Sequence, residues 1–227
     1  MKNLSPIVKA SLRKLAKVYR NIFVTTLFVI FSAVANNGLY AADYFWVGNT
    51  GNWSDFAAHW ATTSGGVVFH TSVPGPADDV YFDAGSFLLT AEVVTIDVPS
   101  NCNSMDWTGA ANNPDLAGFS NLDIYGALTF IPAMTATYSG WIAFRSSNPG
   151  NTIDFSTAIL SIGGIDFNGG GEWTIMSDVD LTLGFGGMQI IKGTLNTNGF
   201  TLDVSGLQSF GTETREMMLL LLAIDFS

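Results

Sequence analysis

The stretch from Ile153 to Gly206 decides the fold: IDFSTAILSIGGIDFNGGGEWTIMSDVDLTLGFGGMQIIKGTLNTNGFTLDVSG. Short phrases such as Ile165-Asp166-Phe167 alternate apolar and polar residues, as strands with one buried face do. Glycine and asparagine accept the positive φ of tight reversals, so they predict turns between the phrases. These expected turns are Gly163-Gly164, Asn168-Gly169-Gly170-Gly171, Gly186-Gly187 and Asn198-Gly199.

The pattern predicts an all-β protein, a right-handed parallel β-helix (β-solenoid), with an antiparallel β-sandwich as the alternative. Stacking of Ile165, Leu181 and Leu202 on successive coils would distinguish the two folds. The phrase Ile153–Ser156 recurs at Ile224–Ser227, a separation that matches about three coils of about 20 to 25 residues each.

Residues 43–100 are expected to form an N-terminal cap and the first strands, and residues 101–227 the solenoid repeats. Glycines between the tryptophans of the cap argue against one long helix. We predict a strand, a turn and a short helical turn around Ser54 to Trp60, with Ser54 as its N-cap. Large aromatic side chains suit a cap that closes the open end of a stacked core. The alternative is a sugar-stacking platform made of Trp46, Trp53, Trp60 or Trp107.

Charge is divided unevenly along the chain. Nineteen residues are acidic and nine are basic, and the acidic residues begin at Asp43. Beyond residue 42 the basic residues are Arg145, Lys192 and Arg215. Such an acidic surface repels phosphates and anionic headgroups, so neither nucleic acid nor a membrane surface is expected as a partner.

Residues 1–42 have the pattern of a signal peptide that is removed on export. Basic residues extend to Arg20, an uncharged apolar segment covers 22–35, and small residues permit cleavage after Ala41 or Ala42. The apolar segment is shorter than the ~20 residues that a membrane-spanning helix needs. A secreted or cell-surface location follows. The apolar run Met217 to Ala223 at the other end suggests that the solenoid is truncated there and belongs to a longer chain.

Several motifs resemble one family. The segments 44–60 (YFWVGNTGNWSDFAAHW), 76–83 (PADDVYFD), 101–109 and 193–202 are similar to the β-helical, adhesin-like part of large secreted surface proteins of Bacteroidetes. The likeness covers about residues 44–216. It implies a β-helical surface segment, secretion by a type IX system, and no known active site. After Arg215 the chain departs from the family's polar strand repeats.

Catalytic motifs are sparse. The sequence has no Gly-x-Ser-x-Gly elbow, P-loop or His-Glu-x-x-His, and His59 and His70 lack partners at metal-ligand spacing. An enzyme that cleaves polysaccharides would need paired carboxylates, which adjacent coils could supply. Its candidate residues are Asp166, Asp178, Asp180 and Asp203, with Arg145, Lys192 and Arg215 as the available cations. A solvated outer face is the simpler interpretation of these aspartates.

No cofactor or metal site is predicted. Asp78, Asp79 and Asp83 supply hard oxygens for calcium but lack the spacing of known calcium loops, and Asp79 is expected to cap the turn after Pro76. Cys102, the one cysteine, is expected to be a small buried apolar residue. The sequence therefore favours a non-catalytic, exported, adhesin-like solenoid whose partner is an extracellular glycan or surface protein. A carbohydrate-binding module and a β-helical enzyme are the alternatives.

Overall fold

The computed structural model describes residues 13–20, 23, 41–184, 187–209 and 211–218. Contacts divide the chain into two units, residues 1–40 and residues 41–227. In the first unit, the described residues of the expected export signal are helical. The rest of that signal, the repeat at Ile224–Ser227 and the apolar run after Met218 lie outside the described residues. Among the described residues, no helix has the length and apolarity to cross a membrane.

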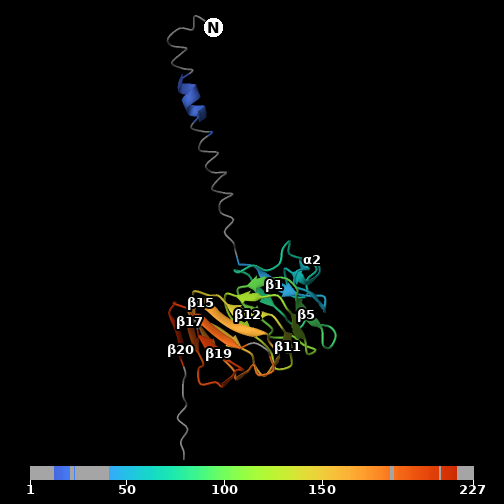
Figure 1. Cartoon of the computed structure of the whole chain (residues 1–227). Coiled ribbons are helices and arrows are strands. Elements are labelled where there is room, and N and C mark those ends of the chain that lie inside the picture. Colours follow the sequence, from blue (N-terminus) through green and yellow to red (C-terminus); the bar gives the residue numbers. More distant parts are fainter. Residues whose placement is uncertain (1–12, 21–22, 24–40, 185–186, 210, 219–227) are drawn as a thin grey trace, which may run out of the picture. The chain divides into compact units, whose positions relative to one another are not determined.

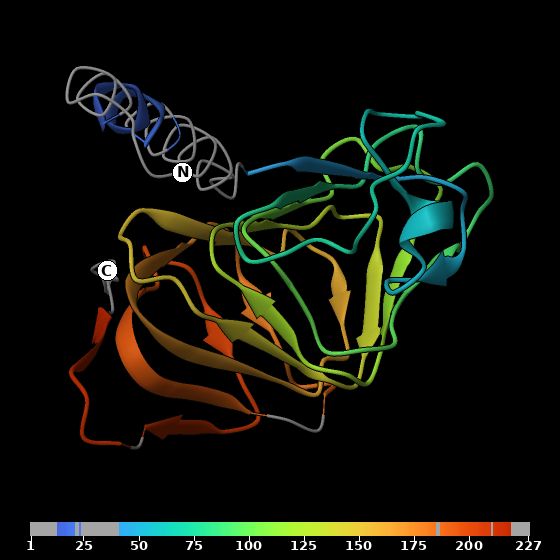
Figure 2. The same cartoon turned by 90° about the horizontal axis from the view of Figure 1, so that it is seen from above.

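Residues 41–218 form a parallel β-solenoid of about six turns, which confirms the predicted β-helix and excludes the β-sandwich. The coils follow one another in chain order, from the α2 (Phe56–His59) end to the red end of the chain (Figures 1 and 2). The solenoid has three faces, which we name A, C and B in the order in which the chain crosses them.

Face A stacks strands whose pairing is parallel throughout. Its register places Met105 beside Leu128, and Leu128 beside Ile153, so a coil takes about 20 to 25 residues as predicted. Its strands are β1 (Asp43–Trp46), β4 (Asp79–Tyr81), β7 (Met105–Asp106), β10 (Leu128–Thr129), β13 (Asn151–Asp154), the second halves of β15 (Gly164–Ile175) and β17 (Met188–Asn196), and β20 (Arg215–Met218).

Face B belongs to the same sheet as face A because β15 and β17 continue from one face to the other. Its strands are β6 (Ser100–Cys102), β9 (Leu122–Ile124), β12 (Trp141–Phe144), the first halves of β15 and β17, and β19 (Leu207–Ser209). Ile165 therefore stacks on Ile142 and Met188. It does not stack on Leu181 or Leu202, as the sequence had suggested, because those residues lie on face C.

Face C is divided into two sheets. Five strands form the first: β2 (Gly51–Asn52), β5 (Val93–Ile96), β8 (Asp115–Gly118), β11 (Thr135–Tyr138) and β14 (Ile159–Leu160). The second holds β16 (Val179–Asp180) and β18 (Leu202–Asp203). Among the described residues no strand pairing joins β14 to β16, so face C is interrupted between these two coils.

One predicted turn is wrong. Asn168 to Gly171 lies inside the continuous strand β15, where the chain passes from face B to face A. These glycines provide space and not a reversal, because a Cβ on Gly169 would lie 2.0 Å from the Ser146 carbonyl oxygen. Gly171 has the same constraint, since its Cβ would lie 2.2 Å from the Asn148 oxygen. The Asn198-Gly199 turn is confirmed by the positive φ of both residues.

An aromatic ladder extends through the core from the N-terminal end. Phe82 stacks on Trp107 at 3.8 Å, Trp107 contacts Phe130 edge-on at 6.2 Å, and Phe130 contacts Phe155 at 5.5 Å. All four rings are at most 1% exposed. Each ring directly follows a face A strand, and the amide of each donates to the adjacent coil. The first three amides donate to a backbone carbonyl oxygen, and the Phe155 amide donates to the Ser177 hydroxyl.

The aromatic-rich N-terminal cap is present as predicted, with one difference at its helix. Trp46, Trp60 and Phe82 contact one another, and so join the cap to the ladder. β3 (Trp60–Ala61) pairs antiparallel to β1 and covers its free edge. The N-cap of α2 is Asp55 and not Ser54, because the Ser54 hydroxyl donates to Asp97 at 2.5 Å instead.

We expect Trp107→Ala to lower the free energy of unfolding by about 3 to 5 kcal/mol, because it leaves a cavity in the middle of the ladder. Trp107→Phe is the matched control. It keeps a ring in place and removes an indole N–H that has no hydrogen-bond partner, so its cost should be much smaller. Urea unfolding of both variants measures the difference, and equal losses would contradict a role for the ring itself.

Candidate functional site

The tryptophans of the predicted sugar platform lie inside the protein. Trp46, Trp53, Trp60 and Trp107 are each 0% exposed. The Trp60 indole donates to the Trp53 carbonyl oxygen at 2.9 Å, and Trp46 stacks on His59 at 4.5 Å. Sugar stacking needs an exposed ring face, and these four rings have none. Their positions agree with the capping interpretation.

The glycines of the motif in the cap make room for His59. A Cβ on Gly51 would lie 1.9 Å from His59 Nε2, and Gly48 has a φ of +85° that a side chain would strain. His59 Nδ1 lies 2.8 Å from the Val47 carbonyl oxygen in a buried position. The segment that carries the family resemblance is thus used for packing the cap.

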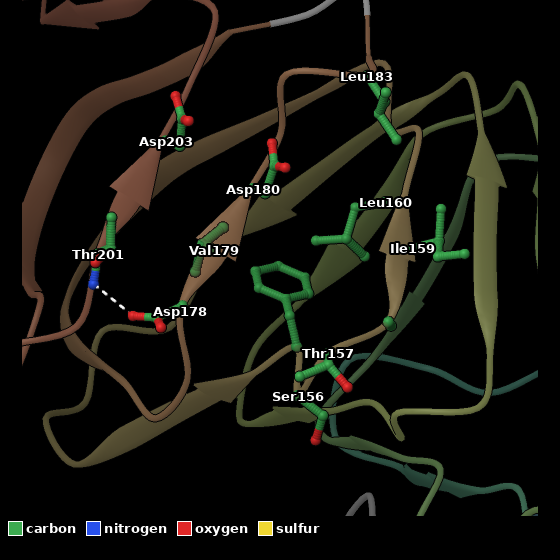
Figure 3. A pocket seen from close by; sticks show the side chains of 12 residues that line it. Ser156, Thr157, Ile159, Leu160, Asp178, Val179, Asp180, Leu183, Thr201 and Asp203 are labelled. Carbon is green, nitrogen blue, oxygen red and sulfur yellow. Dashed lines mark hydrogen bonds between the residues drawn. The ribbon is translucent and has the colours of Figure 1, made fainter.

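Three of the four candidate aspartates come together on face C. Asp178, Asp180 and Asp203 all line a groove, and they lie on the strands and loops around β16 and β18 (Figure 3). Asp166 is not part of this group because β15 carries it on face B. The arrangement follows from the register, which places Asp180 directly beside Asp203.

The groove lies where face C is interrupted, between β14 and β16, and its volume is about 490 Å³. On either side of it the two coils approach closely. A Cβ on Gly184 would lie 2.0 Å from the Ile162 oxygen, and the Met176 amide donates to the Ile153 oxygen at 2.8 Å. The residues that line the groove are Phe155, Ser156, Thr157, Ala158, Ile159, Leu160, Asp178, Val179, Asp180, Leu183, Thr201 and Asp203.

The end of the aromatic ladder accounts for the groove. Phe155 is the last ring, and the equivalent position of the next coil is Ser177, whose hydroxyl accepts the Phe155 amide at 3.0 Å. A serine side chain cannot replace the volume of a phenyl ring between the coils. The groove therefore has an apolar floor, which includes Leu160 and Val179, and an exposed apolar rim at Ile159 and Leu183, which are 60% and 62% exposed.

Two of the three carboxylates of the groove accept hydrogen bonds from neighbouring backbone or side-chain groups. Asp178 accepts a hydrogen bond from the Thr201 amide at 2.8 Å. Asp180 accepts from the hydroxyl of Thr182 at 2.6 Å and from its amide at 2.9 Å, and these bonds lower the pKa of Asp180. A general acid needs a raised pKa. This wall of the groove is thus suited to attracting cations.

On face B, Arg145 lies between two carboxylates. Its Nε is 3.3 Å from Asp123 Oδ1 and its Nη1 is 3.4 Å from Asp166 Oδ1. Desolvation raises the pKa of Asp166, with a further rise from Asp123, while Arg145 opposes both. The other two cations lie outside the groove. Arg215 donates to the carbonyl oxygens of Gly211 and Glu213 at 2.9 and 3.1 Å, and Lys192 lies beside Gly170.

The carboxylates considered for calcium are bound to backbone amides. Asp78 accepts from Ala42 and Gly75, Asp79 from Ser104, and Asp83 from Gly85. Asp78, and not Asp79, thus caps the turn after Pro74, because Asp79 points to the next coil. No cluster of three metal-ligating side chains occurs among the described residues. Cys102 is fully buried as predicted, and burial raises the pKa of its thiol.

Two features were not predicted from the sequence. One is the apolar part of the groove, and the other is the position of Trp141 on the outer face of β12. The groove had a signal, because Phe82, Trp107, Phe130 and Phe155 recur once per coil and Ser177 ends the series. Trp141 had none that distinguished it from the other tryptophans. Its position on the outer face depends on which residues of β12 point inward.

We expect Arg145→Gln to raise the pKa of Asp166 further, because the one cation that stabilises its charge is lost. A raised carboxyl pKa means that the folded state holds the proton more tightly. Stability should therefore fall more steeply in this variant as pH rises from the ordinary carboxyl value through the pKa of folded Asp166. Carboxyl ¹³C NMR titration and urea unfolding between pH 3 and 7 measure the two effects.

Two further variants complete this test. Asp166→Asn in the Arg145→Gln background should remove the added pH dependence, while Arg215→Gln should leave Asp166 unchanged. An unaltered Asp166 titration in Arg145→Gln would contradict the assigned interaction.

Comparisons with known proteins identified no relative of this chain. No family model, no curated protein and no solved structure matched the chain.

Proposed function

We propose that this chain is an exported, non-catalytic β-solenoid with an adhesive or structural role at the cell surface, and that it holds a partner in the groove between β14 and β16. The observation that carries the proposal is the groove itself, which combines two strand edges without a mutual pairing, an apolar floor and three aspartates. The resemblance to secreted surface proteins and the export signal expected in residues 1–42 support the same role.

An extended, basic protein segment is the partner that fits this groove. A free strand edge offers backbone donors and acceptors that a further strand can pair with. The described lining residues include Asp178, Asp180 and Asp203 but no lysine, arginine or histidine. Alternate side chains of an added strand point to opposite faces, so apolar ones can face Leu160 and Val179 while lysines meet the carboxylates.

The electrostatics favour binding over catalysis. Asp180, whose pKa is lowered, is not suited to donate a proton to a leaving group. Asp166, whose pKa is raised, lies on face B, outside the groove. The two kinds of carboxyl group that a glycosidase brings together are thus on different faces of this solenoid.

A hexapeptide of alternating lysine and valine, labelled with a fluorophore, tests the groove. It should bind more tightly than the glutamate–valine peptide, and added salt should weaken it because the contacts are exposed. The double variant Asp180→Asn with Asp203→Asn should weaken binding about tenfold, whereas Glu213→Gln, an exposed carboxyl outside the groove, should have no effect. Equal binding of both peptides, or of the double variant and the parent protein, would refute docking here.

Export is tested separately. Expressed with its own leader in a bacterial host, the mature protein should begin at Ala42 or Asp43. Val29→Arg puts a charge into the apolar segment and should keep the protein inside the cell with residues 1–41 attached. N-terminal sequencing and cell fractionation give both results. Release of the unprocessed chain, or of the Val29→Arg variant, would contradict a cleaved signal peptide.

A further inference from the structure

Trp141 is the one tryptophan outside the core. The chain has six tryptophans, and the other five are 0% exposed. In β12 the side chains of Ile142 and Phe144 point into the core, so the partly exposed Trp141 points to the outer side of face B. Face B is a different surface from the groove, which lies on face C.

The indole ring of Trp141 lies flat on the sheet. A Cβ on Gly164, its neighbour in the next coil, would lie 2.8 Å from Cε2, Cζ2 and Cη2 alike. Equal distances to three adjacent atoms of one ring place that point over the face of the ring and not at its edge. One face of the indole therefore packs on the Gly164 backbone, and the opposite face is turned away from the sheet.

Glycine continues in this row beyond Gly164. The Ile165 amide donates to the Gly187 oxygen, and the Met188 amide donates to the Gly206 oxygen, so Gly187 and Gly206 follow on the next coils. Without side chains in these positions, the surface beside the indole is low and flat. A planar ring of similar size can lie against the indole without displacing any side chain.

The adjacent row consists of planar polar side chains and one alanine. The register places Asp123, Ala143, Asp166, Gln189 and Gln208 beside one another on successive coils. Arg145 joins Asp123 and Asp166, and Gln189 donates to Gln208 at 3.5 Å. Asn101 Oδ1, in the same row, is buried without a hydrogen-bond partner, and Asp166 Oδ1 makes no hydrogen bond beyond its ion pair with Arg145. Carboxylate, guanidinium and amide groups match the paired hydroxyls of a sugar.

We propose that Trp141, Asp123, Arg145 and Asp166 form a binding site for a neutral polysaccharide. A pyranose ring stacks on the free face of Trp141, and its hydroxyls bond to the ion-paired side chains. The two carboxylates leave the site without the excess of positive charge that a polyanion would need. Equivalent side chains repeat at the strand spacing of about 4.8 Å, which is close to the length of one sugar unit in an extended chain.

Tryptophan fluorescence gives a direct test. Because the other five indoles are buried, acrylamide should quench mainly Trp141. The probes are cellohexaose, xylohexaose and mannohexaose, with hexagalacturonate as the charged comparison. At least one neutral oligosaccharide should bind and protect Trp141 from quenching. No binding of any of the three, or binding of hexagalacturonate alone, would overturn the proposal.

Variants separate stacking from general surface effects, with calorimetry as the measure of affinity. Trp141→Ala should weaken binding at least about tenfold, and Trp141→Phe should keep most of it. Gly164→Val keeps the indole but displaces it from the sheet, so it too should weaken binding. Ile159→Ala in the groove should leave sugar binding unchanged, just as Trp141→Ala should leave peptide binding unchanged. Full affinity of Trp141→Ala, with a native circular dichroism spectrum, would overturn the site.

Discussion

Vertical stacking of equivalent side chains, one coil on the next, is the interaction on which this structure depends. A single coil of about 22 residues has no interior of its own and buries its apolar face only against its neighbours. The ladder from Phe82 to Phe155 is the aromatic part of this stack, and the ring centroids of Phe82 and Trp107 are 3.8 Å apart. Where the ladder begins, Trp46, Trp53 and Trp60 close the N-terminal end of the solenoid. Where it stops, at Ser177, the coils stay hydrogen-bonded, and the groove opens farther along them, between β14 and β16.

The same residue type serves different purposes on different faces. Asp78 and Asp79 accept backbone amides and hold neighbouring segments together. Asp180, fully solvated, has its charge stabilised by Thr182, while Asp166 is partly desolvated and depends on Arg145. Because the register determines which residues are neighbours, the aspartates of this acidic chain have distinct local environments.

The sequence was sufficient for the fold class, the parallel coils, the coil length and the aromatic cap, because these follow from a two-residue period and from the large side chains near the N-terminus. It was not sufficient to predict how the chain passes from one face of the solenoid to the next. Gly169 and Gly171 look like turn residues, yet they are required by the carbonyl oxygens of Ser146 and Asn148, which belong to another coil. Nor did the sequence indicate to which face of the solenoid each strand belongs. Leu181 and Ile165 have similar patterns, but Ile165 lies in β15 on face B and Leu181 directly follows β16 on face C.

The candidate site could be predicted only in part. Three of the four aspartates that adjacent coils could bring together do meet at one groove, whereas the tryptophans considered for sugar binding are core residues. Aromatic content alone does not reveal which ring is exposed. The orientation of the Trp141 indole depends on the absence of a Cβ at Gly164. That residue is 23 positions away in the chain and adjacent in space.

The antiparallel strand β3 gives the solenoid a polarity. It turns the chain back on β1 and covers one edge of that strand, so the parallel strands of face A extend from the other edge. Each new coil then meets a template that is already complete, and the chain can assemble in the order in which it is synthesised. Folding of this protein is in that respect comparable to the growth of a filament from a blocked end.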